Sequence, residues 1–385
     1  MNNSRPVVVV VAEATPMRGG IATFAETISA DPLLAQNFDV ELLNTGRVAT
    51  REGGKFNLQN VKFAVADVWH VYRASQRSDI VHLQLVANSG WSSLRAAALN
   101  IAASLGRAKL IAHVHSGVGN AGLPWYASYG PLDRLALRTL RLANMVCTVS
   151  NTGTLTMREF AGRTPVETVD NAVDVDAFPV TRADGEPPTV LFIGLICHRK
   201  GLVELARASR VLHERGVVDW NLILVGGQGP TPESEYNEII AEFESAGLSE
   251  SLVGPEYGEQ IKTRLNQADI FVMPGYLEGQ PMAIIEAMAS GLPVVAYAAG
   301  GVPDMIRDGI EGRLVAPGDS DALADALGDV IVDRTARLRM AEASRRRAED
   351  QHDLKRLSAR LTEIYRTVLD VKDPLASDQR AEEIR

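Results

Sequence analysis

The chain has 385 residues, enough for two domains, and its apolar fraction of 46% is typical of globular α/β proteins with large cores. Aromatic residues make up only 5%, which argues against a stacking platform for single-stranded nucleic acid, so we expect no nucleic-acid partner. The apolar run from Val7 to Ala12 is far shorter than the roughly 20 residues of a membrane-spanning helix, and no signal peptide is evident.

Charge and cysteine content bear on the partners of the protein and on its cellular compartment. The net charge is −9, but residues 1–169 carry 16 Lys and Arg against 11 Asp and Glu, which leaves the remainder strongly acidic. A mildly basic first half suits peripheral contact with an anionic membrane or a phosphorylated substrate, and ordinary surface variation is the favoured alternative. Cys147 and Cys197 lack metal-ligand spacing, so we expect a reduced, cytoplasmic protein, with the inner face of the membrane as an option.

Strands and helices alternate through the first half of the chain. The pattern predicts strands at 6–12, 38–44, 61–65, 79–83, 109–115 and 145–150, and helices at 21–29, 92–105, 132–143 and 152–160. Asn151 or Thr152 is expected to cap the last of these helices. Such alternation indicates a parallel sheet covered on both faces.

The alternation breaks at residues 182–188, which we interpret as a linker, and then resumes. The second half predicts strands at 189–194, 220–225, 252–253, 269–273 and 292–297, and helices at 201–215, 233–246, 282–289, 323–331, 334–350 and 354–370. One face of the last helix is apolar, with Leu354, Leu357, Leu361, Ile364, Tyr365 and Val368. We therefore predict an α/β protein with two doubly wound domains, residues 1–182 and 188–350, and a disordered polar tail, 372–385. Ligands of such sheets bind outside the carboxyl ends of the strands, so the cleft between the domains is the expected site.

Residues 274–293 contain the strongest candidate site. The strand at 269–273 runs through a Gly-rich loop into a helix that begins near Pro281, a residue favoured at the first helical position because it lacks an N–H group. Glu278 lies in the loop, and Glu286 lies one to two turns into the helix. Free N–H groups at a helix start bind anions, so a nucleotide sugar would meet both carboxylates. Two solvated acids on a strand–helix unit are the alternative.

Basic residues follow the strand that ends at Gly194. Arg199 and Lys200 would lie beside the cleft, where they would neutralise a diphosphate, although such a pair is often ordinary surface. A second Gly-rich loop, residues 226–230, is weak evidence by itself. Asp174-Val-Asp176 has the D-x-D form of a Mg or Mn site, but it lies within a turn, and we interpret it as structural.

Three histidines, His82, His113 and His115, lie near the ends of two neighbouring predicted strands. His113 and His115 are two apart on one strand and therefore point to the same side. A histidine of the core or of a sheet end is the common alternative to a functional one.

In this order and spacing the motifs resemble the retaining family-4 group of the GT-B-fold nucleotide-sugar glycosyltransferases, the glycosyl transferases group 1. The resemblance covers nearly the whole chain and is strongest from Val190 to Pro317. It is carried by EGQPMAIIEAMASGLPVVA at 278–296, GGVPDMI at 300–306, IEGRLVAPGD at 310–319, RKG at 199–201, GGQGP at 226–230, NAVDVDAF at 171–178, VSN at 149–151 and GGI at 19–21. It implies two Rossmann-like domains that face a central cleft, and a C-terminal helix, residues 351–371, that packs back on the N-terminal domain.

The resemblance also implies roles for single residues at the donor site. Glu286 matches the glutamate that binds the ribose hydroxyls, Glu278 the one that faces the transferred sugar, and Lys200 the lysine that binds phosphate. His115 matches the histidine near the reacting carbon, and it would be a polar contact to the sugar rather than a general base. The donor-binding set is completed by Gly19, Gly20, Gly194, Gly279, Gln280, Pro281, Met282 and Ala283.

Two positions limit how this set can bind phosphate. Pro281 has no N–H to donate, so the N–H groups of Gln280, Met282 and Ala283 would hold the distal phosphate or the sugar. The family commonly has Gly-Arg after the strand that ends at 194, whereas this chain has Gly194-Leu195. We expect Arg199 to replace the missing arginine.

By resemblance, the reaction is transfer of a sugar from a UDP- or GDP-sugar to a glycan, lipid-linked or small-molecule acceptor, with retained anomeric configuration and a front-face mechanism. Arg199, Lys200 and the helix start would stabilise the departing diphosphate, so no metal or other cofactor is expected. Loop aromatics of the first domain, Trp91, Trp125, Tyr126 and Tyr129, are candidates for acceptor binding, with core packing as the alternative. A GT-B sugar-nucleotide epimerase and a non-catalytic nucleotide-sugar-binding protein are the rival functions.

Overall fold

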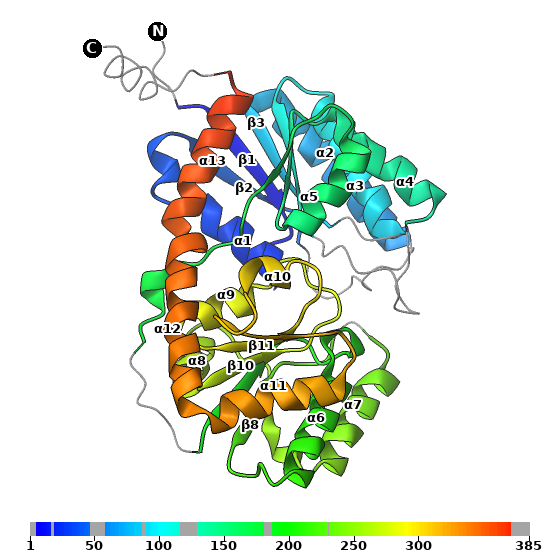
Figure 1. Cartoon of the computed structure of the whole chain (residues 1–385). Helices are drawn as coiled ribbons and strands as arrows, with labels where there is room; N and C mark the ends of the chain where they lie inside the picture. The colour runs from blue at the N-terminus through cyan, green and yellow to red at the C-terminus, as the bar shows by residue number, and fades with distance from the viewer. Residues whose placement is uncertain are drawn as a thin grey trace, which may run out of the picture.

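The computed structural model describes residues 5–16, 19–46, 58–86, 90–115, 129–180, 187–229 and 231–370. They form two six-stranded parallel sheets, each with helices packed against it, one above the other in Figure 1. The first sheet has the order β2-β1-β3-β4-β5-β6 and the second β12-β11-β10-β7-β8-β9. The predicted α/β fold of two doubly wound domains is therefore confirmed.

The first domain buries both faces of its sheet, and this explains its nearly all-apolar strands. One face packs against α1 and α13, and the other packs against α2, α3 and α5. Its elements are β1 (Val7–Ala12), α1 (Gly20–Ser29), η1 (Leu34–Gln36), β2 (Asp39–Asn44), α2 (Leu58–Arg77), β3 (Ile80–Leu85), α3 (Trp91–Ser104), β4 (Lys109–Val114), α4 (Pro131–Leu137), η2 (Arg138–Leu142), β5 (Met145–Thr148), α5 (Asn151–Ala161) and β6 (Val166–Thr168).

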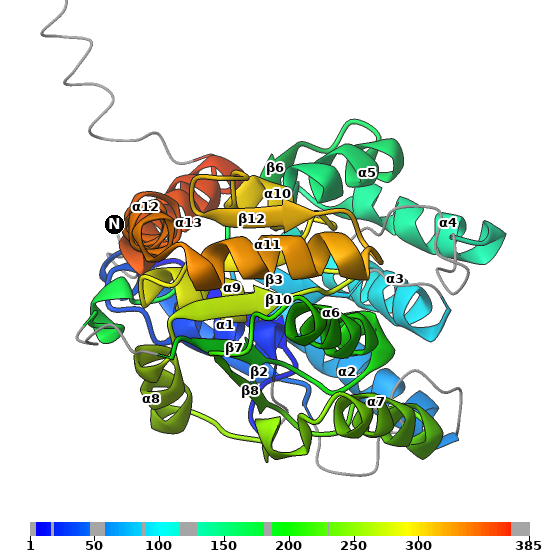
Figure 2. The same cartoon turned by 60° about the horizontal axis from the view of Figure 1, so that its bottom comes forward.

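The second domain has one large core around β7, β8, β10 and β11, and Figure 2 shows the helices that cover it. Its elements are η3 (Val175–Ala177), β7 (Thr189–Ile193), η4 (His198–Lys200), α6 (Leu202–Glu214), β8 (Asn221–Val225), α7 (Glu233–Ser245), η5 (Ser249–Ser251), β9 (Leu252–Gly254), α8 (Glu259–Gln267), β10 (Ile270–Met273), α9 (Met282–Ala289), β11 (Val294–Tyr297), α10 (Val302–Met305), β12 (Gly312–Val315), α11 (Ser320–Val332) and α12 (Arg334–Gln351).

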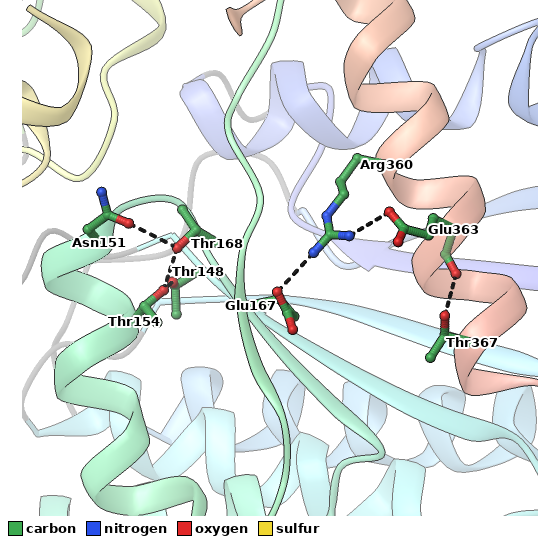
Figure 3. Close-up of polar contacts among 8 residues, drawn as sticks. All are labelled: Thr148, Asn151, Thr154, Glu167, Thr168, Arg360, Glu363 and Thr367. Carbon is green, nitrogen blue, oxygen red and sulfur yellow. Dashed lines mark hydrogen bonds and ion pairs between the residues drawn. The ribbon is translucent and has the colours of Figure 1, made fainter.

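The last helix, α13 (Leu354–Val368), leaves the second domain and packs on the first, as predicted (Figure 1). Its apolar face joins the core around β1, and Tyr365 is fully buried, with its hydroxyl hydrogen-bonded to His82 Nδ1 at 2.9 Å. On its other side, Arg360 bridges Glu167 of β6 and Glu363 of the same helix (Figure 3). Helix α13 thus closes one face of the first sheet.

The chain passes between the domains twice, and the cores show where. Ala172 belongs to the core of the first domain, and Val173 belongs to that of the second. The return passage lies between Ala348, in the second core, and Leu357, in the first. The predicted linker at 182–188 lies mostly, and the predicted polar tail wholly, outside the described residues.

One predicted strand is wrong. Residues 61–65 lie in helix α2, where Ala64, Val71 and Ala74 are buried at helical rather than alternating spacing. The sequence prediction also missed β6, α8, α10 and β12, which are short or polar. No helix in the described ranges is both long and apolar enough to cross a membrane.

Two predicted helix starts are shifted by one residue. Ser150, not Asn151 or Thr152, caps α5, because its hydroxyl accepts a hydrogen bond from Gly153 N at 3.0 Å. Pro281 is the N-cap of α9 rather than its first residue, with an extended ψ of 124°.

Candidate active site

The carboxyl ends of the two sheets face each other, and the loops that follow the strands meet there. Gly20, at the start of α1, lies so close to the start of α9 that an added Cβ would be 3.3 Å from Met282 Cγ. A Cβ on Gly301, which precedes α10, would lie 2.7 Å from Ser150 Cβ. The structure therefore brings the predicted glycine loop of the first domain against the predicted donor loop of the second.

The β10–α9 loop, residues 274–281, is held by the Gly300–Gly301 turn. A Cβ on Gly300 would lie 1.8 Å from Glu278 O, and one on Gly301 would lie 2.0 Å from Gly279 O. Gly300 also has a φ of 59°, a conformation that side chains other than glycine rarely adopt. Gly301 N donates to Glu278 O at 3.0 Å. The two glycines thus let a second loop approach the backbone that positions Glu278.

Glu278 is buried and lies against both predicted cations. Lys200 Nζ is 2.7 Å from Glu278 Oε1, and Arg199 Nη1 is 3.5 Å from the same oxygen. Arg199 Nη1 also donates to Leu277 O at 3.0 Å, and its side chain is 39% exposed, so it can still face a ligand. The structure therefore gathers Arg199, Lys200 and Glu278 into one cluster with a net positive charge.

Two further glycines let the loops at the ends of β7, β8 and β10 pack against one another. Gly201 has a φ of 67°, and a Cβ there would lie 1.9 Å from Pro274 O, so the turn after Lys200 packs directly on the β10–α9 loop. A Cβ on Gly226 would lie 1.7 Å from Gly194 O, which brings the ends of β7 and β8 together. Leu195, where an arginine was expected, is exposed at 41%.

Glu286 lies in the second turn of α9, and its carboxylate differs from that of Glu278. The backbone oxygen of Glu286 accepts hydrogen bonds from Ser290. No hydrogen bond within the described residues reaches the carboxylate. Burial raises the pKa of Glu286 to about 7. A half-buried carboxylate without a partner is well suited to accept hydrogen bonds from ligand hydroxyls. Met282 and Ala283 begin the same helix, so their N–H groups have no partner within it.

The three histidines separate into two kinds. His82 and His113 are fully buried and hydrogen-bonded to each other at 3.2 Å, so the core interpretation holds for them. His115 is half-buried and follows β4; its Nε2 lies 2.7 Å from Gln84 Oε1, which can only accept, so Nε2 carries the proton. Burial lowers the pKa of His115 to about 3, so the imidazole is neutral at physiological pH.

Most of the remaining candidates lie in the first domain. Tyr129 packs edge-on against Phe160 at 5.9 Å, beside the core. Trp91 begins α3 and is half-buried. Trp125 and Tyr126 lie outside the described residues. Asp176, of the D-x-D sequence, forms an exposed ion pair with Lys355 at 3.0 Å.

Sequence reasoning missed one role. Gln280 was selected for its backbone N–H, but its side chain is buried and bonds to Asp170 and Asn171 of the first domain. A Gln within a Gly-rich loop gives no local signal for a partner more than 100 residues away.

Comparison with known proteins supports the same interpretation. The family described as glycosyl transferases group 1 matches residues 175–347. A GDP-mannose-dependent alpha-(1-6)-phosphatidylinositol monomannoside mannosyltransferase of Mycolicibacterium smegmatis is 32% identical over 258 residues, which cover 61% of this chain and 65% of that protein. An alpha-maltose-1-phosphate synthase of Mycobacterium tuberculosis is 30% identical over 199 residues, which cover 48% of this chain and 49% of that protein. The chain thus spans less than two thirds of the length of either relative.

Solved structures share the whole two-domain architecture. A sucrose-phosphate synthase from Thermosynechococcus elongatus superposes with a TM-score of 0.79 at 19% identity, over 96% of this chain and 100% of that one. HepE of Anabaena in complex with UDP-glucose has a TM-score of 0.70 at 18% identity, over 94% of this chain and 100% of that one. At these identities the likeness establishes the fold, which is the GT-B architecture.

The buried pair of Lys200 and Glu278 leads to a first prediction. Lys200→Met leaves the Glu278 carboxylate without its closest cation, so we expect a loss of about 3 kcal/mol in the free energy of unfolding, measured by urea denaturation. The double variant Lys200→Met/Glu278→Gln removes both charges and should be more stable than the single variant. Arg199→Met, at a longer and more exposed contact, is the control and should cost less than about 1 kcal/mol. Equal losses in the single and double variants would contradict the pairing.

Glu286 leads to a second prediction, on pH. Its folded-state pKa of about 7 lies above the ordinary value of 4.5, so the folded state is penalised progressively as pH rises between these values. Glu286→Gln removes the ionisation, so it should stabilise the protein at pH 8 by on the order of 3 kcal/mol and leave the stability at pH 4 nearly unchanged. Unfolding curves across this range measure the difference, with exposed Glu250→Gln as the control. A stability difference that does not vary with pH would show that Glu286 is not shifted.

Proposed function

We propose that the chain is a glycosyltransferase of the group 1 family, whose model matches residues 175–347, and that it uses a nucleoside diphosphate sugar. The carrying observation is the arrangement of charges on one strand–loop–helix unit. Glu278, paired with Lys200 and Arg199, lies before α9, and the carboxylate of Glu286, which has no partner among the described residues, lies in the second turn of that helix. This spacing suits a ligand with a diphosphate at one end and a ribose at the other.

The donor is held by groups of the second domain. Glu286 accepts hydrogen bonds from the ribose hydroxyls, and Lys200 and Arg199 neutralise the diphosphate. The N–H groups of Met282 and Ala283 lie at the positive end of α9 and bind the distal phosphate or the sugar. We retain UDP and GDP as alternatives, because HepE was solved with UDP-glucose and the mycolicibacterial relative depends on GDP-mannose.

The transfer step needs charge stabilisation more than a protein nucleophile. The bond between the anomeric carbon and the phosphate oxygen breaks, and its electron pair remains on the departing diphosphate. The acceptor hydroxyl attacks on the same face, forms the new bond to carbon, and gives its proton to a diphosphate oxygen, so the configuration is retained. Lys200, Arg199 and the start of α9 stabilise the leaving group, each such donor lowering the barrier by roughly 2–4 kcal/mol. With this charge supplied by the chain, we propose a reaction without metal.

The first domain contributes the sugar side and the acceptor. His115 is neutral, so it acts as a polar contact to the transferred sugar and does not supply a charged acid. Gly19 and Gly20 bring the first domain close to the diphosphate. The acceptor is a glycan, a lipid-linked sugar or a small molecule. Neither the sugar-nucleotide epimerase nor the non-catalytic binding protein is favoured by any contact at this site.

A donor screen tests the proposal. Thermal unfolding is measured with UDP, GDP, ADP and their sugars, followed by assay of sugar transfer or hydrolysis. One base should raise the melting temperature of the wild type, and Glu286→Ala should weaken that nucleotide about 10- to 100-fold, since a hydrogen bond to a charged group is lost. Glu250→Ala, which changes an exposed residue of η5, should bind the nucleotide as the wild type does. A wild type that neither binds nor turns over any member of the panel would refute the proposed function.

A further part of the proposal is peripheral contact with an anionic membrane at a cytoplasmic face. On α2, Val65, Trp69 and Tyr72 are exposed at 64%, 53% and 40% and recur at helical spacing on one face. Lys62 and Arg73 lie on the same helix, and its acid, Asp67, is buried against Arg95. An apolar face with basic neighbours suits insertion among anionic headgroups.

Vesicle sedimentation tests this contact. Vesicles with phosphatidylglycerol should bind the chain more strongly than phosphatidylcholine vesicles, and raised salt should reduce the binding. Trp69→Ser should weaken it several-fold, whereas Leu338→Ser, an exposed leucine of α12 in the other domain, should not. Equal binding by the two variants would exclude α2 as the contact surface.

A further inference from the structure

The side chain of Gln280 links the β10–α9 loop to the other domain. Its Oε1 accepts a hydrogen bond from Asn171 N, and its Nε2 donates to Asp170 Oδ1 at 2.6 Å. Asn171 Nδ2 in turn donates to the backbone oxygen of Gln280 at 2.8 Å. The residue is only 5% exposed. Its side chain and carbonyl are thus committed to residues 170–171, which leaves the backbone N–H for a ligand.

These bonds cross between the domains at the passage of the chain. Val169 and Ala172, on either side of Asp170 and Asn171, are in the core of the first domain, whereas Val173 is in the core of the second. Gln280 therefore contacts the last residues of the first domain before the chain enters the second. Any rotation of one domain against the other must be absorbed at or next to this point.

The return passage of the chain is bonded to the same residues. His352, almost fully buried, donates from Nδ1 to Asn171 O at 3.0 Å. Val173 N donates to His352 O at 3.0 Å, and Leu354 N donates to Val173 O at 2.9 Å. The two passages therefore form one hydrogen-bonded unit, and Gln280 is the residue that connects this unit to the β10–α9 loop.

We propose that Gln280 is a positioning residue that couples donor binding on the β10–α9 loop to the hinge between the domains. The inference rests on the proposed function, because it takes a nucleotide sugar to be the ligand of that loop. The donor contacts Glu278 and Met282, two residues to either side of Gln280, so binding shifts or fixes Gln280. Because its buried side chain is hydrogen-bonded through both Oε1 and Nε2, it cannot move alone without leaving polar groups unsatisfied, and residues 170–171 move with it.

A second contact between the domains is weaker. Asp304 of α10 accepts from Asn151 N at 2.8 Å and from Asn151 Nδ2 at 3.0 Å, at the exposed start of α5. Asn151 is held by Thr168, which continues through Thr154 to Thr148 (Figure 3). Water competes for these exposed bonds, whereas the two bonds between Gln280 and Asn171 are buried and the one to Asp170 is part-buried. The buried link is therefore the one able to transmit a change in the loop.

The test reverses the polarity of one hydrogen bond. Gln280→Glu keeps the shape of the side chain but sets a carboxylate against Asp170. Asp170→Asn in the same chain restores a donor opposite an acceptor. For each variant, kcat and KM are measured with the nucleotide sugar whose base stabilises the wild type. The change in radius of gyration on adding UDP or GDP is measured by small-angle X-ray scattering.

We expect Gln280→Glu to lower kcat/KM roughly 10-fold or more and to abolish the nucleotide-induced change in radius of gyration, and we expect the double variant to recover both. Lys355→Met, which breaks an exposed ion pair beside the hinge, should behave as the wild type. Should Gln280→Glu fail to fold, Asp170→Ala removes the same acceptor without adding charge and is judged by the same two measurements.

Two results would overturn the inference. If Gln280→Glu has a lower melting temperature but an unchanged kcat, KM and scattering response, the residue is structural only. If the double variant fails to recover the response, the bond to Asp170 is not the coupling element. A wild type that binds neither nucleotide refutes the proposed function and this inference together, whereas a normal wild type with an unaffected variant refutes the inference alone.

Discussion

The arrangement of the site depends on a buried carboxylate that requires a cation. A carboxylate removed from water needs a compensating charge, and Lys200 Nζ lies 2.7 Å from Glu278 Oε1. That pairing joins two loops from different strands of one sheet, β7 and β10, and the glycines at 201 and 300 allow the backbones to approach. The result is a preorganised charged surface at the start of α9, where a diphosphate would find cations and free N–H groups already in place.

The second constraint is that the site lies where two domains meet. The loops that approach it, before α1, after β5 and before α9, all follow the carboxyl ends of parallel strands, where ligands of such sheets bind. The same geometry requires the chain to pass between the domains close to the site, at residues 172–173 and again near 352. Under the proposed function, donor binding and domain movement would therefore share residues, and Gln280 is the buried example.

Much of the fold and part of the site were predictable from local sequence. Strand 270–273, its Gly-rich loop and the helix with Glu286 follow from residues adjacent in the chain. The apolar face of α13 likewise predicts a helix that packs on a core. The wrong strand at 61–65 arose because a short segment and its longer surroundings favour different structures. These residues are β-branched and apolar enough for a strand, but the burial of Ala64, Val71 and Ala74 favours a helix over a longer span.

The sequence by itself determined the two alternating α/β halves, the strand–loop–helix unit with its two glutamates, and the basic pair at 199–200, because these depend on neighbours within one or two turns. Only the tertiary structure decided which polar groups pair. It placed Lys200 on Glu278, left the carboxylate of Glu286 without a partner among the described residues, made His82 and His113 part of the core, and joined Gln280 to Asp170 and Asn171. Those partners are between 31 and 110 residues apart, and burial, which only folding sets, gives each contact its strength.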